Sequence, residues 1–252
     1  MENLVDIIIP NFNKGKYLDQ TIKSVINQTF TKWKIYLIDD NSNDNSKEIL
    51  EQYKKNSKIY LVFLKKNMGP SFCRNLGIRL SSSKYISFLD SDDFWTKNKL
   101  DEQIKFMEQK KIDFSYTDYI SFYEKDKKLV YLKPTNITNY FNYNKFINNS
   151  SINSSTMIIS RSILKNSRFK KLDLLEDYLF KCEIFKRGVS AYKFNLPSAY
   201  YRILKKSRSS TKFKNILYLW KINKKFNKLN PLSNLISIIL ISYNSFKKYG
   251  IK

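Results

Sequence analysis

Residues 84–95 read KYISFLDSDDFW and join an apolar run to three closely spaced carboxylates. The run is short and rich in aromatic and β-branched side chains, which predicts a buried strand. Asp90, Asp92 and Asp93 follow it, although like charges this close repel and carboxylates are rarely left buried and unpaired. Mg²⁺ or Mn²⁺, which take oxygen ligands, would explain the cluster. The alternative is an exposed turn in which Asp92 or Asp93 caps a helix that begins near Lys97.

The chain before this stretch alternates between predicted strands and helices. Apolar runs predict strands at residues 4–9, 34–38, 59–64 and 84–89. Helical spacing of apolar residues predicts helices at 17–29, from near residue 44, and at 70–80. This order is typical of a parallel sheet with right-handed crossovers, whose ligands bind beyond the carboxyl ends of the strands. The turn IDDNSND at 38–44 ends the second strand, so we expect two acidic turns at one edge of the sheet.

The second half of the chain is less regular. The sequence predicts strands at 113–119, 128–132 and 155–160, a helix at 174–188, and a loop or short helices at 134–153. The length of 252 residues suits one sizeable α/β domain with a small appendage, or two small domains.

Composition excludes several classes of site. The chain has two cysteines and no histidine, which argues against a disulfide framework and excludes a Cys/His zinc site and histidine-based catalysis. The N-terminus MENLVDIIIPNF has no basic region before its short apolar run, so we expect no signal peptide. No apolar stretch reaches about 18 residues, so we expect no transmembrane helix and a cytoplasmic location.

The net charge of +24 predicts an anionic partner, although codon bias toward lysine is an alternative source. The distribution is uneven, because residues 184–252 carry sixteen Lys and Arg and no Asp or Glu. Uniform codon bias does not explain that asymmetry.

Four motifs occur in order: IIIPNFN at 7–13, LIDDNSND at 37–44, KNMGPSFCRNLG at 66–77 and LDSDD at 89–93. Together they resemble the family 2 glycosyltransferases, inverting enzymes that use nucleotide-diphosphate sugars. INSSTMIISRSIL at 152–164 and LLEDYLF at 174–180 resemble later segments of that family, so the resemblance covers roughly residues 4 to 210. It implies a GT-A fold, an α/β architecture with a Rossmann-like, mostly parallel sheet flanked by helices. The first half, 1–95, would bind the nucleotide and 96–210 the acceptor.

The resemblance implies a nucleotide site made of Pro10, Phe12, Asn13, Asp39, Asp40, Arg74 and Asp92. In it, Asp40 hydrogen-bonds the base and Asp39 flanks it. A carboxylate accepts from a base N3–H, which suits uracil or thymine and disfavours cytosine. The alternatives are that Asp39 and Asp40 cap the following helix and that Arg74 forms a surface salt bridge of little energetic value.

The resemblance also implies the metal and catalytic residues. Asp93 would be the main ligand of Mn²⁺ or Mg²⁺ and Asp90 would support it, with the cation bridging the donor diphosphate. Asp177, beside Glu176, would be the general base that takes the proton of the acceptor hydroxyl. The alternative is that both acids at the start of this helix compensate its dipole.

PSAYYRILKKSRSS at 197–210 resembles a later family segment. It implies a loop at the diphosphate and acceptor that contains Arg202, Lys205, Lys206 and Ser207. Leu204 stands where many members have histidine, which leaves the metal to carboxylate, phosphate and water. The alternative is a solvated cationic turn.

The tail, residues 211–252, predicts a basic helical extension. Apolar residues at helical spacing form a stripe of Leu232, Leu235, Ile236, Ile239, Leu240 and Tyr243. Such a helix flanked by lysines suits peripheral contact with an anionic membrane, here the inner face of the cytoplasmic membrane. The alternative is that this helix packs on the core of the protein itself.

We therefore expect an inverting glycosyltransferase that moves a sugar, from UDP rather than another nucleotide, to a glycan or lipid-linked saccharide in bacterial surface polysaccharide or lipopolysaccharide synthesis. A basic nucleic-acid- or membrane-binding module is the alternative. It leaves the acidic clusters unexplained, and no RNP-like, zinc-finger or helix-turn-helix signature occurs, so we expect no nucleic-acid partner. A sugar nucleotidyltransferase would need a Gly-rich loop after the first strand, and IIIPNFNKGKY has one glycine.

Overall fold

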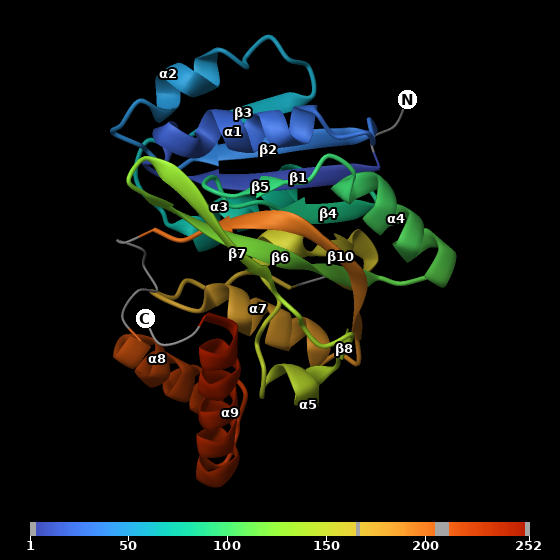
Figure 1. The fold of residues 1–252 in the computed structure, drawn as a ribbon, viewed down its shortest axis with the longest axis vertical. Helices are drawn as coiled ribbons and strands as arrows, with labels where there is room; N and C mark the ends of the chain where they lie inside the picture. Colours follow the sequence, from blue (N-terminus) through green and yellow to red (C-terminus); the bar gives the residue numbers. More distant parts are fainter. Residues whose placement is uncertain (1–3, 165–166, 205–211, 250–252) are drawn as a thin grey trace.

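The computed structural model describes residues 4–164, 167–204 and 212–249. Within them, ten strands form one sheet, with a main path of β3-β2-β1-β4-β9-β6-β10-β5 (Figure 1). The first half alternates as predicted and contains β1 (Val5–Asn11), α1 (Gly15–Ile26), β2 (Trp33–Asp39), α2 (Ser46–Glu51), β3 (Ile59–Phe63), α3 (Pro70–Leu80) and β4 (Tyr85–Phe88). β1 pairs in parallel with β2 and β4, and β2 with β3. The predicted parallel sheet is thereby confirmed for this half.

The centre of this half is apolar and tightly packed. Ile7, Ile8 and Ile9 of β1 are completely buried, as expected of a parallel strand covered on both faces. A Cβ on Gly77 of α3 would lie only 2.4 Å from the Cγ2 atom of Ile8. The helix therefore approaches β1 at a distance that only glycine permits.

The second half continues the same sheet. Its elements are β5 (Phe94–Trp95), α4 (Lys99–Lys110), β6 (Phe114–Lys125), β7 (Lys128–Pro134), β8 (Tyr140–Phe141), α5 (Tyr143–Phe146), a 3₁₀ helix (Ser154–Thr156), β9 (Ile158–Ser160), α6 (Arg161–Leu164), α7 (Glu176–Phe185) and β10 (Ala191–Arg202). β9 pairs antiparallel with both β4 and β6, which joins the two halves. The division at residue 95 stays a prediction, and the sheet runs through it without a break.

β10 was not predicted from the sequence. It pairs in parallel with β6, and its register shifts between Phe194 and Ala199. Pro197 lies within that shift, where a residue without an N–H group interrupts a strand least. The strand ends at Arg202 and so brings this residue to the sheet edge.

The tail forms two helices, α8 (Lys212–Lys225) and α9 (Pro231–Tyr249), of which only the second was predicted. Figure 1 shows them at the opposite end of the molecule from α2 and β3. The hydroxyl of Tyr178 in α7 donates to Asn223 Oδ1 in α8 at 2.8 Å, which ties the tail to the main domain. In the described ranges, each helix is too short or too polar to cross a membrane.

Candidate active site

The ends of β1 and β2 are held together by polar side chains. Asn11 Nδ2 donates to Asp39 Oδ1 at 2.7 Å, and Asp39 also accepts from the backbone N–H and the hydroxyl of Ser42 at 3.0 and 2.6 Å. Asp39 is buried. Its carboxylate therefore organises the first acidic turn, as a local cap would.

Asp40 joins β2 to the start of α3. Its two carboxylate oxygens accept from the backbone N–H groups of Met68 and Gly69 at 2.6 and 2.8 Å. Gly69 precedes α3 and has a φ of 86°, a conformation that favours glycine. Asp40 is 3% exposed, and its expected hydrogen bond to a base stays a prediction.

The three residues expected beside the base lie along the end of β1 and the turn after it. Pro10 lies within β1, and the Phe12 side chain is 45% exposed at the sheet edge. Asn13 adopts a φ of 53°, and its Oδ1 accepts from the backbone N–H of Asn43 at 2.8 Å. The structure thus brings both turns together and leaves the ring of Phe12 accessible.

The acidic turn after β4 places its three carboxylates in different surroundings. Asp93 is 1% exposed; its Oδ2 accepts from the Ser155 hydroxyl at 2.7 Å and its Oδ1 from the backbone N–H of Arg202 at 2.9 Å. Burial, together with the charges of Asp92 and Asp90, raises the pKa of Asp93 well above its ordinary value. The expected main metal ligand therefore lies inside the protein, where it binds the turn to β10 and the 3₁₀ helix.

Asp92 and Asp90 are the accessible members of the turn. Their side chains are 19% and 32% exposed. Lys14 Nζ lies 2.7 Å from Asp92 Oδ2, so the lysine ammonium group forms an ion pair with this carboxylate. Sequence reasoning missed Lys14; the signal was a basic residue in NKGKY, the turn after the first predicted strand.

Arg74 connects the acidic turn to α7. Its guanidinium is 2.7 Å from Asp90 Oδ1 and 3.2 Å from Glu176 Oε1. Although burial opposes the charge, these two carboxylates raise the pKa of Arg74 above its ordinary value. The side chain is 7% exposed, so Arg74 is a buried bridge between the acidic turn and α7 and not the surface salt bridge of the alternative.

Asp177 lies one residue further along α7 and is part of a second ion pair. Lys181 Nζ is 2.8 Å from Asp177 Oδ2 and donates to the carbonyl of Ile152 at 2.7 Å. Burial favours the neutral acid, but the charges of Lys181 and Arg74 outweigh it and lower the pKa of Asp177. Asp177 is therefore ionised at neutral pH, and its side chain is 37% exposed.

Arg202 holds the sheet edge together. Its Nε donates to the carbonyl of Asp92 at 2.9 Å and its Nη2 to Gln20 Oε1 at 2.6 Å. The guanidinium also lies 4.2 Å from the ring centroid of Tyr17. Arg202 is therefore a buried residue that connects neighbouring segments, and it is not part of an open loop. Lys205, Lys206 and Ser207 were predicted to act with it and lie outside the described residues.

The fit of a divalent cation rests on Asp90 and Asp92. Across the described ranges, no three or more Asp, Glu or Cys side chains gather in an arrangement that could hold a metal ion by themselves. Two accessible carboxylates still match the usual Mg²⁺ site, which is completed by substrate phosphates and water. The donor set therefore fits a cation that binds together with a diphosphate.

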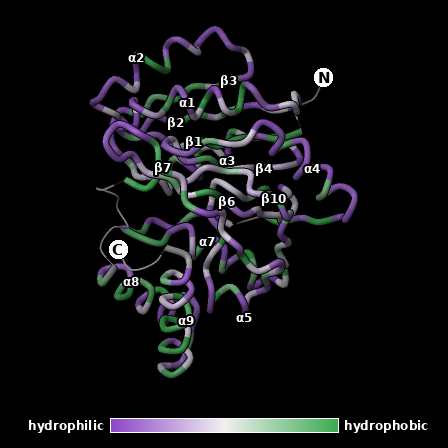
Figure 2. The backbone as a smooth tube through the Cα atoms, in the orientation of Figure 1, coloured by the Kyte–Doolittle hydropathy of each residue, from purple (hydrophilic) through white to green (hydrophobic). Residues whose placement is uncertain are grey.

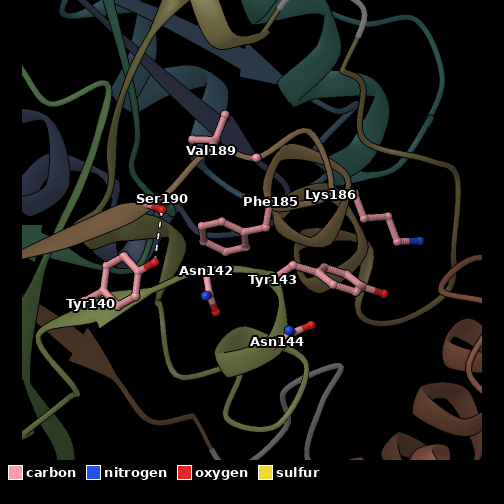
Figure 3. A pocket seen from close by; sticks show the side chains of 9 residues that line it. Tyr140, Asn142, Tyr143, Asn144, Phe185, Lys186, Val189 and Ser190 are labelled. Carbon is pink, nitrogen blue, oxygen red and sulfur yellow. Dashed lines mark hydrogen bonds between the residues drawn. The ribbon is translucent and has the colours of Figure 1, made fainter.

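A hollow of about 580 Å³ lies elsewhere, beside the C-terminal end of α7 (Figure 3). Figure 3 shows the side chains of Tyr140, Asn142 and Phe185 around it. None of the predicted site residues lines it, because Glu176 and Asp177 lie at the other end of α7. It is separate from the acidic site.

Comparison with known proteins identifies the family of the chain. The family model described as Glycosyl transferase family 2 matches residues 6–168. The Escherichia coli protein WfaP, a UDP-Glc:alpha-D-GlcNAc-diphosphoundecaprenol beta-1,3-glucosyltransferase, is 35% identical over 216 residues, which are 85% of this chain and 83% of that protein.

Two solved structures show the fold. S. aureus TarS 1–349 in complex with UDP-GlcNAc gives a TM-score of 0.73 at 19% identity, over 97% of this chain and 73% of that chain. Mannosyltransferase PcManGT from Pyrobaculum calidifontis, in complex with GDP-Man and Mn²⁺, gives 0.69 at 11% identity, over 100% and 77%. The GT-A fold expected from the sequence is confirmed. The chain is a glycosyltransferase that belongs to glycosyl transferase family 2.

Proposed function

We propose that the protein transfers a sugar from a UDP-sugar to a hydroxyl of a lipid-linked saccharide, with inversion at the anomeric carbon. The observation that carries the proposal is the ion-pair chain from Asp90 through Arg74 to Glu176. It brings the acidic turn of the first half next to the acidic start of α7. The proposed reaction needs a cation site for the departing diphosphate and a base for the attacking hydroxyl. These two groups must lie close together.

In this proposal the nucleotide of the donor binds at the ends of β1 and β2. The exposed ring of Phe12 offers a face for the base. Asp40 is buried, so a hydrogen bond from the base N3–H would have to use the second lone pair of an oxygen that already accepts a backbone N–H. UDP as the nucleotide is supported by WfaP, which is named for UDP-Glc, and by TarS, which binds UDP-GlcNAc.

Asp92 and Asp90 are the proposed ligands of Mn²⁺ or Mg²⁺, with Asp93 as the buried residue that fixes their turn. This assignment follows accessibility, because both oxygens of Asp93 accept hydrogen bonds inside the protein. Mn²⁺ is present in the PcManGT structure, which has the same fold. When bound, the cation supplies positive charge that stabilises the departing diphosphate. Lys14, in contact with Asp92, can move its ammonium to the phosphates.

Asp177 is the proposed general base. It is ionised and partly exposed, so it can accept the proton of the acceptor hydroxyl as that oxygen attacks the anomeric carbon. Glu176 is buried and paired with Arg74, so we assign it a positioning role. One displacement assisted by one base inverts the configuration, so an α-linked donor gives a β-linked product.

The acceptor is the least constrained part of the proposal. WfaP is named for an acceptor in which GlcNAc is α-linked to diphosphoundecaprenol. An acceptor of that class, a saccharide on a polyprenyl diphosphate, would place the enzyme in bacterial surface polysaccharide synthesis.

The test separates binding from chemistry. Thermal shifts with UDP, GDP, dTDP and CDP would be measured with Mn²⁺ and with EDTA, and turnover would be followed with UDP-glucose and an alkyl diphosphate of GlcNAc. A ligand at 100 times its dissociation constant adds about 2.7 kcal/mol to the free energy of unfolding. We expect that stabilisation from UDP with Mn²⁺.

Three variants assign the roles. Asp92→Asn should lose the Mn²⁺-dependent part of the UDP shift. Asp177→Asn should keep UDP binding and lose kcat by about 100- to 10,000-fold, the usual contribution of a general base. Glu183→Gln, an acid on the same helix paired with Lys170, is the matched control and should change neither. Full kcat in Asp177→Asn would assign the base elsewhere, and no shift with any nucleotide would remove the donor site.

A further inference from the structure

Helix α9 packs against the protein with a mixed face, on which Ile238 and Ile241 join the core and polar side chains lie beside them. Asn234 and Ser237 are 1% and 0% exposed. Asn234 Nδ2 donates to the carbonyl of Trp220 at 3.1 Å, Asn223 Nδ2 donates to Ser237 Oγ at 3.1 Å, and the Ser237 hydroxyl donates to the carbonyl of Ile147. These hydrogen bonds fix which face of α9 is turned inward.

The apolar stripe of α9 consequently faces solvent. Leu232, Ile239 and Tyr243 are 69%, 56% and 61% exposed, and Leu235 and Ile236 are 49% and 45% exposed. A surface helix of a soluble protein ordinarily turns such a stripe toward the core. Figure 2 shows hydrophobic positions recurring along the whole of α9. The alternative that this helix packs on the core is confirmed for the face with Ile238 and Ile241, whereas the stripe itself stays exposed.

Helix α8 adds exposed apolar residues to the same end of the molecule. Phe213, Leu217 and Trp220 are 71%, 45% and 37% exposed. They are spaced by four and three residues, so they lie on one side of α8. Two successive helices that both leave large apolar side chains in water mark an interaction surface.

The charged residues of the tail itself are all positive, and the hydroxyl of Tyr218 in α8 donates to one acid of the main domain, Asp173. Exposed lysines of the tail include Lys214, Lys221, Lys224, Lys225 and Lys228. No Asp or Glu follows Glu183 in the sequence. A second copy of the chain would bring lysines against lysines with no acid of the tail to pair them, which opposes a symmetric dimer through this face.

We propose that the α8–α9 hairpin is a docking surface for an anionic lipid bilayer, with both helices lying in the plane of the interface. Apolar side chains would enter the boundary between headgroups and acyl chains, and the lysines would contact anionic headgroups. A bilayer offers an apolar environment to these side chains and anionic groups to the lysines. The inference goes beyond the proposed function and stands on the exposure and charge of the tail alone.

The experiment is flotation of the full chain with two kinds of vesicle. One contains phosphatidylglycerol and phosphatidylcholine, and the other phosphatidylcholine alone. We expect binding to the anionic vesicles, reduced by salt, and much weaker binding to the neutral ones.

Two double variants probe the surface, each with a matched control. Ile236→Gln/Ile239→Gln removes exposed apolar area of α9, and Leu80→Gln/Leu129→Gln removes exposed apolar side chains elsewhere. Lys224→Gln/Lys225→Gln removes two charges of the tail, and Lys65→Gln/Lys66→Gln removes two exposed charges from the loop after β3. We expect each tail variant to weaken partitioning on the order of tenfold and each control to leave it within twofold.

Equal binding of the tail variants and the wild type would overturn the proposal. So would a concentration-dependent dimer in analytical ultracentrifugation that disappears in Ile236→Gln/Ile239→Gln while anionic vesicles stay unbound, because a second copy would then cover the face. The thermal shift with UDP is measured on every variant. A variant that keeps this shift and loses flotation separates membrane docking from the donor site.

Discussion

Lys181 keeps Asp177 ionised from within the same helix. The two charged groups are 2.8 Å apart, and Lys181 is 1% exposed, so water screens their attraction poorly. Arg74 of α3 acts on Asp177 in the same direction. The proposed base is thus prepared by two cations from two elements.

This arrangement predicts the pH dependence of turnover. Only ionised Asp177 can accept a proton, and its pKa is lowered, so kcat should persist to a pH below the ordinary pKa of an aspartate. Lys181→Met removes the largest lowering influence, so the acid limb of kcat should move to higher pH. The pH profile of kcat with UDP-glucose measures this shift.

The control for this prediction lies at the C-cap of the same helix. Lys186 donates to the carbonyl of Phe226, away from Asp177, so Lys186→Met should keep the wild-type profile. An unchanged acid limb in folded Lys181→Met would mean that Asp177 does not limit turnover at low pH.

At this scale, the sequence predicted which residues gather but not how they pair. Asp39, Asp40 and the acidic turn end predicted strands, so their shared edge follows from local patterns. Arg74 and Glu176 are 102 positions apart, and their pairing depends on the path of the sheet between them. The burial of Lys181 could not be predicted either, because a lysine is ordinarily exposed. It results from the same packing of distant segments.

Among the elements, α3 lies against β1 through a single glycine. A Cβ at Gly77 would meet Ile8 Cγ2 at 2.4 Å and Cγ1 at 2.9 Å. In an exposed helix, replacing glycine by alanine stabilises by about 1 kcal/mol. At Gly77 the crowding against Ile8 opposes that gain. The sign of the change in the free energy of unfolding therefore tests how closely α3 packs on β1.

We expect Gly77→Ala to lower the free energy of unfolding by about 1–3 kcal/mol, as overpacking of a core does. Urea unfolding measures it. In the background Ile8→Ala, which removes the crowded methyl groups, the same substitution should be neutral or stabilising. Stabilisation by Gly77→Ala with Ile8 present would show that α3 does not approach β1 this closely.

Elements with regular patterns were predicted, including β6, β7, β9 and α7 of the second half, whereas β10 was not. The strands and helices of residues 4–89 follow from periodicity, and so does α9. β10 was missed because Pro197 interrupts its pattern and its partner β6 is distant in sequence. For α9 the pattern identified the apolar stripe, but hydrogen bonds of Asn234 and Ser237 decide which face turns inward.

At the scale of the whole molecule, the two predicted halves share one sheet, and strands pair across the predicted division at residue 95. β9 lies between β4 and β6, and β5 pairs with β10 at residues 94–95 and 199–200. The tail is attached through several hydrogen bonds, among them those of Tyr178 to Asn223 and of Ser237 to the carbonyl of Ile147. Continuous pairing of this kind favours unfolding of both halves together, since neither half keeps its sheet neighbours without the other.

The three tryptophans test this cooperativity. Trp33 lies in β2, Trp95 in β5 and Trp220 in α8. Variants that keep one tryptophan, with the other two changed to phenylalanine, would be unfolded in urea and followed by fluorescence and far-UV circular dichroism. Within each variant the two probes should give the same midpoint, because a cooperative transition is independent of the probe. Comparing the two probes inside one variant makes the result independent of any destabilisation that the substitutions cause.

If the Trp33 variant showed a fluorescence midpoint apart from its circular dichroism midpoint, residues 1–95 would unfold as a separate unit, and the single sheet would not determine cooperativity. If only the Trp220 variant did so, the hairpin would unfold independently of the catalytic domain, and it could rearrange on a membrane without disturbing the acidic site.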